Sequence, residues 1–405
     1  MLPSRNSVLI SATRLIGLLK QLRHRRSAPH GPQPPAEDIR MFCGPNPAKR
    51  ALLSLSPSAW HTAVAQAPVI QFFNLAGFTY EVTKALNEKG YIVDIVDAAA
   101  RGIEPARHYD FYLGHAGNTR SILDKLDPGT FVMHYASGGY WKEFNRMSKE
   151  RYDNFCKRRD IPRVETFVRS LIGTEDGEEY LARRADASFN AGPRTVATFR
   201  GVIQNMPLLY LGSYVQRDLL VDDRDFEAGR RNFAYFSGTG GNIQKGMDLI
   251  IEAFARMPEL NLYIYCKVED EVSCAYRREL ALPNIHYVYH YSAGPLRKKM
   301  RALLRRINFT IGAAIDTGPT TAMLGTFGLG LIPVGYIDIE GREEDSVLTE
   351  ECSIESLMDC AQRASAKPAS WCQSASLATL ERFERLHQPE VFGRNFHAFL
   401  GRLGL

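Results

Sequence analysis

The residues best suited to chemistry in this chain lie in two short stretches of its second half. The first stretch places a lysine after a glycine-rich turn: Gly238, Gly240, Gly241 and Lys245. An apolar strand is expected before this turn, at 233–236, and apolar residues then recur at helical spacing over 247–257. Such a turn brings backbone N–H groups and the positive end of a helix to one point. Together with the charge of Lys245, the pattern favours a phosphate or diphosphate ligand, with a plain structural turn as the alternative.

The second stretch follows another predicted strand, 308–314, and is rich in small and hydroxyl-bearing residues. Its residues are Asp316, Thr317, Gly318, Pro319, Thr320 and Thr321. Pro319 suits the first position of a helix, which we predict over 322–329. A second helix start therefore follows the carboxyl end of a strand, with hydroxyls and one carboxylate around it.

The common fingerprints of other enzyme classes are absent from the sequence. The first stretch has no third glycine in register, so it is not the Gly-x-Gly-x-x-Gly of dehydrogenases, and Lys245 precedes its glycine, unlike the lysine of a P-loop. There is also no Gly-x-Ser-x-Gly elbow of a Ser-His-Asp hydrolase. These three classes are therefore disfavoured.

Taken together, the two stretches resemble the donor-binding domain of the GT-B glycosyltransferases, particularly those of family 4. Lys245, Gly246 and Asp248 match the first motif of that family, in which a lysine and a glycine are followed by a hydrophobic residue and an aspartate. The arginine usual before this lysine is missing.

The second motif of the family is matched less completely. It ends in a strand that corresponds to 330–334 with an additional residue. The two glutamates of the motif fall on Thr317 and Gly325, and neither residue is acidic. Asp316 lies next to the first position, whereas Gly325 has no acidic substitute.

The resemblance implies an α/β protein of two doubly wound Rossmann-like domains that face each other across a cleft. It implies a hexosyltransferase-type glycosyltransferase, retaining and metal-independent, that moves a sugar from a nucleotide-diphosphate sugar to a glycan or lipid-linked acceptor in surface polysaccharide biosynthesis. Lys245 and the two helix starts would stabilise the leaving diphosphate without a cofactor, and Asp316 would contact the donor sugar or ribose. A nucleotide-sugar epimerase of the same fold and a non-catalytic scaffold of a polysaccharide-synthesis complex are the alternatives, the latter because of Gly325.

Strands alternate with helices in both halves, which predicts parallel sheets covered on both faces. The strands expected in the first half are 52–55, 91–96, 111–113, 131–135, 187–190 and 208–211; those in the second are 233–236, 262–266, 285–289, 308–314 and 331–334. We predict a basic extension and linker at 1–40, an acceptor-side domain at 41–222, a donor-binding domain at 223–385 and a C-terminal helix at 386–405 that crosses back to the first domain.

Acid–base chemistry in the first half has three candidates, His115, His134 and Glu143. Both histidines lie at or just after predicted strand ends, where open α/β sheets bind ligands. A histidine at such a position is also commonly structural. We assign His134, His115 and Asp316 as the catalytic candidates.

Two spacings that could hold a metal ion fit structural roles better. His286 and His290 lie on a predicted strand, where four residues span roughly 13 Å, too far to share one ion. Asp223 and Asp225 form an Asp-x-Asp pair, but this pair precedes a strand and does not follow one. The sequence therefore predicts no metal site.

The composition is that of a globular protein large enough for two domains, with 405 residues, 45% hydrophobic, 23% charged and net charge +5. This mild charge does not favour nucleic acid as a partner.

Residues 1–40 show no pattern of a membrane span or signal peptide. Their basic, partly apolar start either lies on an anionic membrane or packs on the rest of the protein. The 7 cysteines form no Cys-x-x-Cys and predict free thiols in a reducing compartment. We therefore expect a cytoplasmic protein, with a peripheral position on the inner face of the cell membrane as the alternative.

Overall fold

The structure of the protein is a computed structural model. It describes residues 35–65, 74–105, 107–115, 117–163, 175–190, 192–203, 207, 209–210, 212, 219–238, 241–289, 296–315, 321–339, 341 and 344–405. Several sequence predictions lie outside these residues: the N-terminal helix, Gly240, and residues 316–320 of the second stretch.

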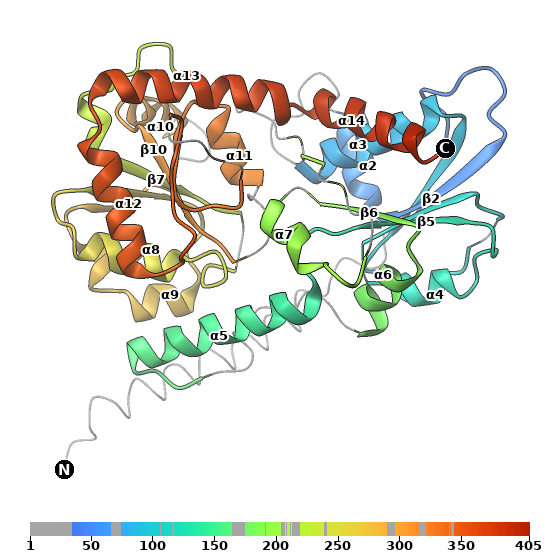
Figure 1. Ribbon diagram of the computed structural model, residues 1–405, viewed down its shortest axis with the longest axis horizontal. Helices are drawn as coiled ribbons and strands as arrows, with labels where there is room; N and C mark the ends of the chain where they lie inside the picture. Colours follow the sequence, from blue (N-terminus) through green and yellow to red (C-terminus); the bar gives the residue numbers. More distant parts are fainter. Residues whose placement is uncertain are drawn as a thin grey trace.

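The chain folds around two six-stranded sheets, one in each half (Figure 1). The first sheet has the order β1-β3-β2-β4-β5-β6, with β1 at Ala36–Ile39, β2 at Lys49–Leu55, β3 at Tyr91–Asp97, β4 at Phe111–Gly114, β5 at Phe131–Tyr135 and β6 at Ala187–Phe189. The second has the order β12-β11-β10-β7-β8-β9, with β7 at Asn232–Phe236, β8 at Asn261–Tyr265, β9 at Ile285–Tyr287, β10 at Phe309–Ala313, β11 at Ile332–Tyr336 and β12 at Val347–Leu348.

Neighbouring strands in the described sheets are parallel, except that β1 is antiparallel to β3. The central strands β7 and β10 are buried along their whole lengths. This agrees with their nearly continuous apolar sequences, because a parallel sheet is covered by helices on both faces.

The helices follow the strands in the alternating order expected from the sequence. In the first half they are α2 (Pro57–Ala65), α3 (Asn74–Glu88), α4 (Thr119–Leu123), α5 (Trp141–Arg159), α6 (Tyr180–Arg184) and α7 (Pro193–Thr198). In the second half they are α8 (Met247–Ala255), α9 (Asp270–Ala275), α10 (Arg297–Leu304), α11 (Thr321–Phe327), α12 (Ile354–Ala366), α13 (Ala369–Leu386) and α14 (Pro389–Arg402).

The α/β fold class predicted from the sequence is confirmed, but several local predictions differ. The structure adds β1, α2 and β12, which the sequence analysis did not predict. The strand predicted at 208–211 is wrong for Leu209 and Tyr210, which lie in no strand. The Leu209 N–H donates to the carbonyl oxygen of Asn190, the residue after β6, at 2.8 Å.

Two helices pack against the sheet formed by the other half of the sequence (Figure 1). Tyr152 and Phe155 of α5 pack into the apolar core around the second sheet. Phe392 and Phe396 of α14 pack into the core of the first sheet, where the rings of Phe396 and Phe189 are 5.6 Å apart. Each half therefore buries apolar surface supplied by the other.

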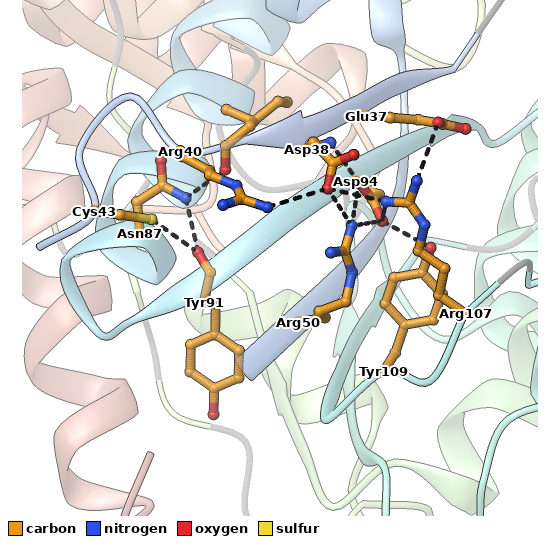
Figure 2. Close-up of polar contacts among 11 residues, drawn as sticks. Glu37, Asp38, Arg40, Cys43, Arg50, Asn87, Tyr91, Asp94, Arg107 and Tyr109 are labelled. Carbon is orange, nitrogen blue, oxygen red and sulfur yellow. Dashed lines mark hydrogen bonds and ion pairs between the residues drawn. The ribbon is translucent and has the colours of Figure 1, made fainter. Parts of the chain in front are cut away.

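A buried carboxylate attaches the antiparallel edge strand β1 to the first sheet (Figure 2). Asp94 of β3 accepts from the Asp38 N–H at 2.7 Å, from the Tyr109 hydroxyl at 2.8 Å and from Arg50 Nη2 at 3.0 Å. Asp38 has a φ of 54°, a left-handed conformation that is costly for a residue other than glycine. The bond to Asp94 compensates for that cost, so we assign this cluster a structural role.

Candidate functional site

The glycine turn lies between the carboxyl end of β7 and the start of α8. A Cβ added to Gly238 would lie 3.3 Å from Lys245 Nζ, so the ammonium lies against this glycine. The Lys245 N–H donates to the Gly241 carbonyl at 3.0 Å, and the Tyr235 hydroxyl donates to the Lys245 carbonyl at 3.1 Å. These contacts place the lysine at the carboxyl edge of the second sheet, where open α/β sheets bind ligands.

Two backbone N–H groups of the turn already have an acceptor within the chain. Gly241 and Asn242 donate to the two carboxylate oxygens of Glu269 at 2.9 and 2.8 Å. In return, the Glu269 N–H donates to Asn242 Oδ1 at 2.7 Å. The N–H groups of Gly241 and Asn242 are therefore engaged by a carboxylate of the chain itself. The donor-binding role of Gly241 stays a prediction.

A helix of the first half holds the turn close to the end of β10. Gly246 has a φ of 76°, and a Cβ there would lie 2.3 Å from the Ala313 carbonyl oxygen, so this position requires glycine. Arg151 of α5 donates to the carbonyl oxygens of Gln244, at 3.2 Å, and of Ala313. The Ile315 N–H also donates to the Gln244 carbonyl, at 3.1 Å. The turn after β7 and the segment after β10 therefore meet at the same edge.

The second predicted stretch is described only at its end. Thr321 begins α11, close to the predicted helix start, and Gly325 lies inside this helix. The donor-side roles of Asp316, Thr317, Gly318, Pro319 and Thr320 stay predictions, because these residues lie outside those that the structure describes.

His134 is the last but one residue of β5 and is 1% exposed. Its Nδ1 lies 3.1 Å from the Ser188 hydroxyl, and its Nε2 lies 3.9 Å from Glu178 Oε1. Burial lowers the pKa of His134 to about 3, so the imidazole is neutral at physiological pH. A neutral histidine at this depth orients its neighbours and does not exchange protons directly with bulk water.

His115 follows β4 directly and is only half-buried. Its Nε2 forms a hydrogen bond with the hydroxyl of Ser137, which follows the adjacent strand β5. Burial lowers the pKa of His115 to about 4. The structure thus brings His115, Ser137 and His134 to the carboxyl edge of the first sheet, and His115 is the more accessible of the two histidines.

Glu178 is a buried carboxyl that the sequence analysis did not assign to the site. It lies in the π-helical turn Glu175–Glu179 and is 5% exposed. Its Oε2 has no hydrogen-bond partner among the described residues. Burial raises its pKa to about 8, so at neutral pH the structure holds a protonated carboxyl beside a neutral imidazole.

This protonation predicts a pH-dependent effect of Glu178→Gln. Between the ordinary carboxyl pKa of 4.5 and about 8, the folded chain keeps a proton that the unfolded chain has lost. The stability contributed by Glu178 therefore falls as pH rises through this window. Because glutamine stays neutral, the stability of the variant relative to the natural protein should increase from pH 5 to pH 8 by more than about 1.4 kcal/mol, one pKa unit. Urea unfolding at both pH values measures this, and an unchanged difference would show that Glu178 is ionised in the fold.

The aspartates of the Asp-x-Asp pair have structural partners. Asp223 pairs with Arg305 at 3.0 Å, and Asp225 Oδ1 accepts from the Ala228 N–H at 2.9 Å. In the described part of the chain, no group of three or more His, Cys, Asp or Glu side chains could hold a metal ion. The described cysteines are free thiols. None of the helices described has the length and apolar character of a membrane span.

The protein is similar in structure, though not in sequence, to several proteins of known structure. No family model and no curated protein matches the sequence. The structure is similar to that of HepE from Anabaena, a crystal structure in complex with UDP and glucose, at 11% identity and a TM-score of 0.50, covering 87% of this chain and 99% of that chain. It is also similar to a glycosyltransferase from Rickettsia africae at 9% identity and a TM-score of 0.51, covering 87% and 97% of the two chains. A likeness to TarM has 10% identity and a TM-score of 0.48, and covers 71% of this chain but only 53% of TarM.

The matches to HepE and to the Rickettsia glycosyltransferase confirm the GT-B fold predicted from the sequence. At identities of 9% and 11%, the structures from Rickettsia and Anabaena establish the arrangement of the two sheets. What the chain binds and transfers has to be argued from its own residues.

Proposed function

We propose that this chain is a glycosyltransferase that moves a sugar from a nucleotide-diphosphate sugar to a glycan or lipid-linked acceptor. The observation that carries the proposal is the position of Lys245. Its ammonium lies against Gly238 at the carboxyl edge of the second sheet, and the candidate acid–base groups lie at the carboxyl edge of the first. The crystal structure of HepE, which shares the fold, contains UDP and glucose.

The carboxyl edges of the two sheets would have different roles in the reaction. Cleavage of the donor releases a diphosphate, and Lys245 would stabilise the negative charge that develops on it. On the other edge, His115 would accept the proton of the acceptor hydroxyl, because it is the more accessible histidine and its lowered pKa keeps it unprotonated at neutral pH. His134, fully buried beside Glu178 and Ser188, would orient the groups around it.

Lys245→Ala is expected to weaken the binding of a nucleoside diphosphate by about 1.5–3 kcal/mol, the range of a hydrogen bond to a charged group. The substitution removes the ammonium and leaves the backbone bonds of the turn intact. Isothermal titration calorimetry with UDP and related diphosphates measures the change. The nucleoside without phosphate should bind both forms equally.

Lys299→Ala is the matched control, because Lys299 is an exposed lysine on α10 and its loss changes the net charge equally. It should leave diphosphate affinity unchanged. If Lys245→Ala also leaves it unchanged, the glycine turn has only a structural role and the proposal loses its main support.

Four finer properties of the proposed transferase stay predictions: retention of anomeric configuration, independence from metal, an acceptor in surface polysaccharide biosynthesis, and contact of the N-terminal extension with an anionic membrane. Release of a diphosphate that depends on an added acceptor would separate the transferase from an epimerase or a scaffold of the same fold.

A further inference from the structure

The short helix α7 lies between the two halves of the molecule (Figure 1). It belongs to the first half by sequence, because it follows β6, the last strand of the first sheet. Its two ends, however, make polar contacts with different parts of the molecule. These contacts make α7 a physical connection between the two candidate edges.

The first end of α7 is held by a carboxylate from the second half. Asp338, two residues after β11, is 6% exposed. One of its oxygens accepts from the Arg194 N–H at 2.8 Å, and the other accepts from the Thr195 N–H at 3.1 Å and the Thr195 hydroxyl at 2.8 Å. The Arg194 guanidinium lies 3.6 Å from the same carboxylate and 3.8 Å from the centre of the Tyr336 ring, at the end of β11.

The other end of α7 contacts His134, the buried histidine of the first sheet, and the start of α5. The Tyr140 N–H, at the start of α5, donates to the Thr198 hydroxyl at 2.7 Å. The ring of Phe199, which ends α7, lies 5.8 Å from His134 and 5.7 Å from Tyr140 in edge-to-face contacts. The helix α7 thus connects the Asp338 carboxylate of the second half to Tyr140 and His134 of the first half.

We propose that Asp338 is a positioning residue for sugar transfer, which acts by fixing α7, and with it Tyr140 and His134, relative to the second sheet. This inference rests on the proposed function. The physical reason is that a buried carboxylate with several donors tolerates little displacement, since separation would leave it unpaired. A small displacement of the acceptor side from the donor side is costly for a reaction that depends on aligned groups.

The test compares Asp338→Asn with Thr195→Val and with a control in the full-length protein. Asparagine has the size of aspartate but carries no charge. Its amide N–H₂ would also face one of the backbone N–H groups of α7, where no hydrogen bond can form. Thr195→Val removes one hydrogen bond to Asp338 and little volume. Glu350→Gln is the control, because Glu350 pairs with the same Arg194 at 3.6 Å but its side chain is 93% exposed.

Asp338→Asn is expected to lower kcat for transfer by about tenfold to a hundredfold, with unchanged affinity for the nucleoside diphosphate. Thr195→Val should act in the same direction with a smaller effect, and Glu350→Gln should have none. Faster hydrogen exchange in α7 and a larger radius of gyration by solution scattering should accompany the loss. An unchanged kcat in Asp338→Asn would overturn the inference. So would a parallel loss of kcat and diphosphate affinity in Asp338→Asn and Thr195→Val that is explained by a lower unfolding midpoint of the two variants.

The failure of the proposed function is distinguishable from failure of this inference. If the natural protein binds no nucleoside diphosphate and transfers no sugar, the proposed function fails, and with it the role of Asp338 in transfer. The connection itself is then judged by exchange and scattering, and unchanged α7 exchange in Asp338→Asn would show that the carboxylate does not fix the helix.

Discussion

Phe155→Ala is expected to lower the free energy of unfolding of the second half by about 3–5 kcal/mol, although Phe155 belongs to a helix of the first half. The side chain is fully buried, and its ring lies 6.0 Å from that of Tyr276 in the core of the second sheet. Alanine would leave a cavity in this core that α5 cannot fill without moving. Urea unfolding, combined with hydrogen exchange of β7 and β10, measures the loss and its location.

Lys149→Ala on the same helix is the control for helix stability, because Lys149 is exposed. It should change stability by less than about 0.5 kcal/mol. Loss of exchange protection confined to the first sheet in Phe155→Ala would contradict the placement of α5 in the second core.

Arg158→Ala should also destabilise the protein by about 3–5 kcal/mol, because it removes the partner of a buried charge. Arg158 pairs with Asp248, whose side chain is fully buried, and at 3.0 Å with Glu252, whose side chain is 12% exposed. Arg151 and Arg158 oppose the burial that raises the pKa of Asp248. Without Arg158, Asp248 loses its hydrogen-bonded ion-pair partner and must be protonated or carry a less well compensated charge in the core of the second half. Thermal and urea unfolding measure the effect.

The same helix offers a matched control in Arg146, which pairs with Glu143 and Glu150 on the surface with 59% of its side chain exposed. Arg146→Ala should cost at most about 1 kcal/mol, as for exposed ion pairs. Adding Asp248→Asn to Arg158→Ala should restore part of the stability, because it removes the unpaired carboxylate. Equal effects of the two arginine variants would show that the Arg158–Asp248 pair is open to water.

Much of the fold was predictable because its signals are local. The glycine turn between 236 and 247 and the helical spacing of Ile250, Ile251 and Phe254 predicted the β7–α8 unit that the structure contains. The apolar runs at 131–135 and 308–314 likewise became β5 and β10. In contrast, β1 pairs through four residues of mixed composition, and the contacts of Asp94 that hold it join residues far apart in the chain.

The sequence by itself determined most strands of the two sheets, their alternation with helices, and the position of Lys245 at a strand end, because periodicity and turn residues act over a few positions. The tertiary structure alone decided that Glu269 occupies the N–H groups of the glycine turn, that Glu178 lies beside His134, and that Asp338 contacts α7. Each of these is a carboxylate whose partner comes from another element of the fold. Nothing within a few residues of a carboxylate indicates which distant donor will neutralise it, because burial and proximity arise only when the elements pack together.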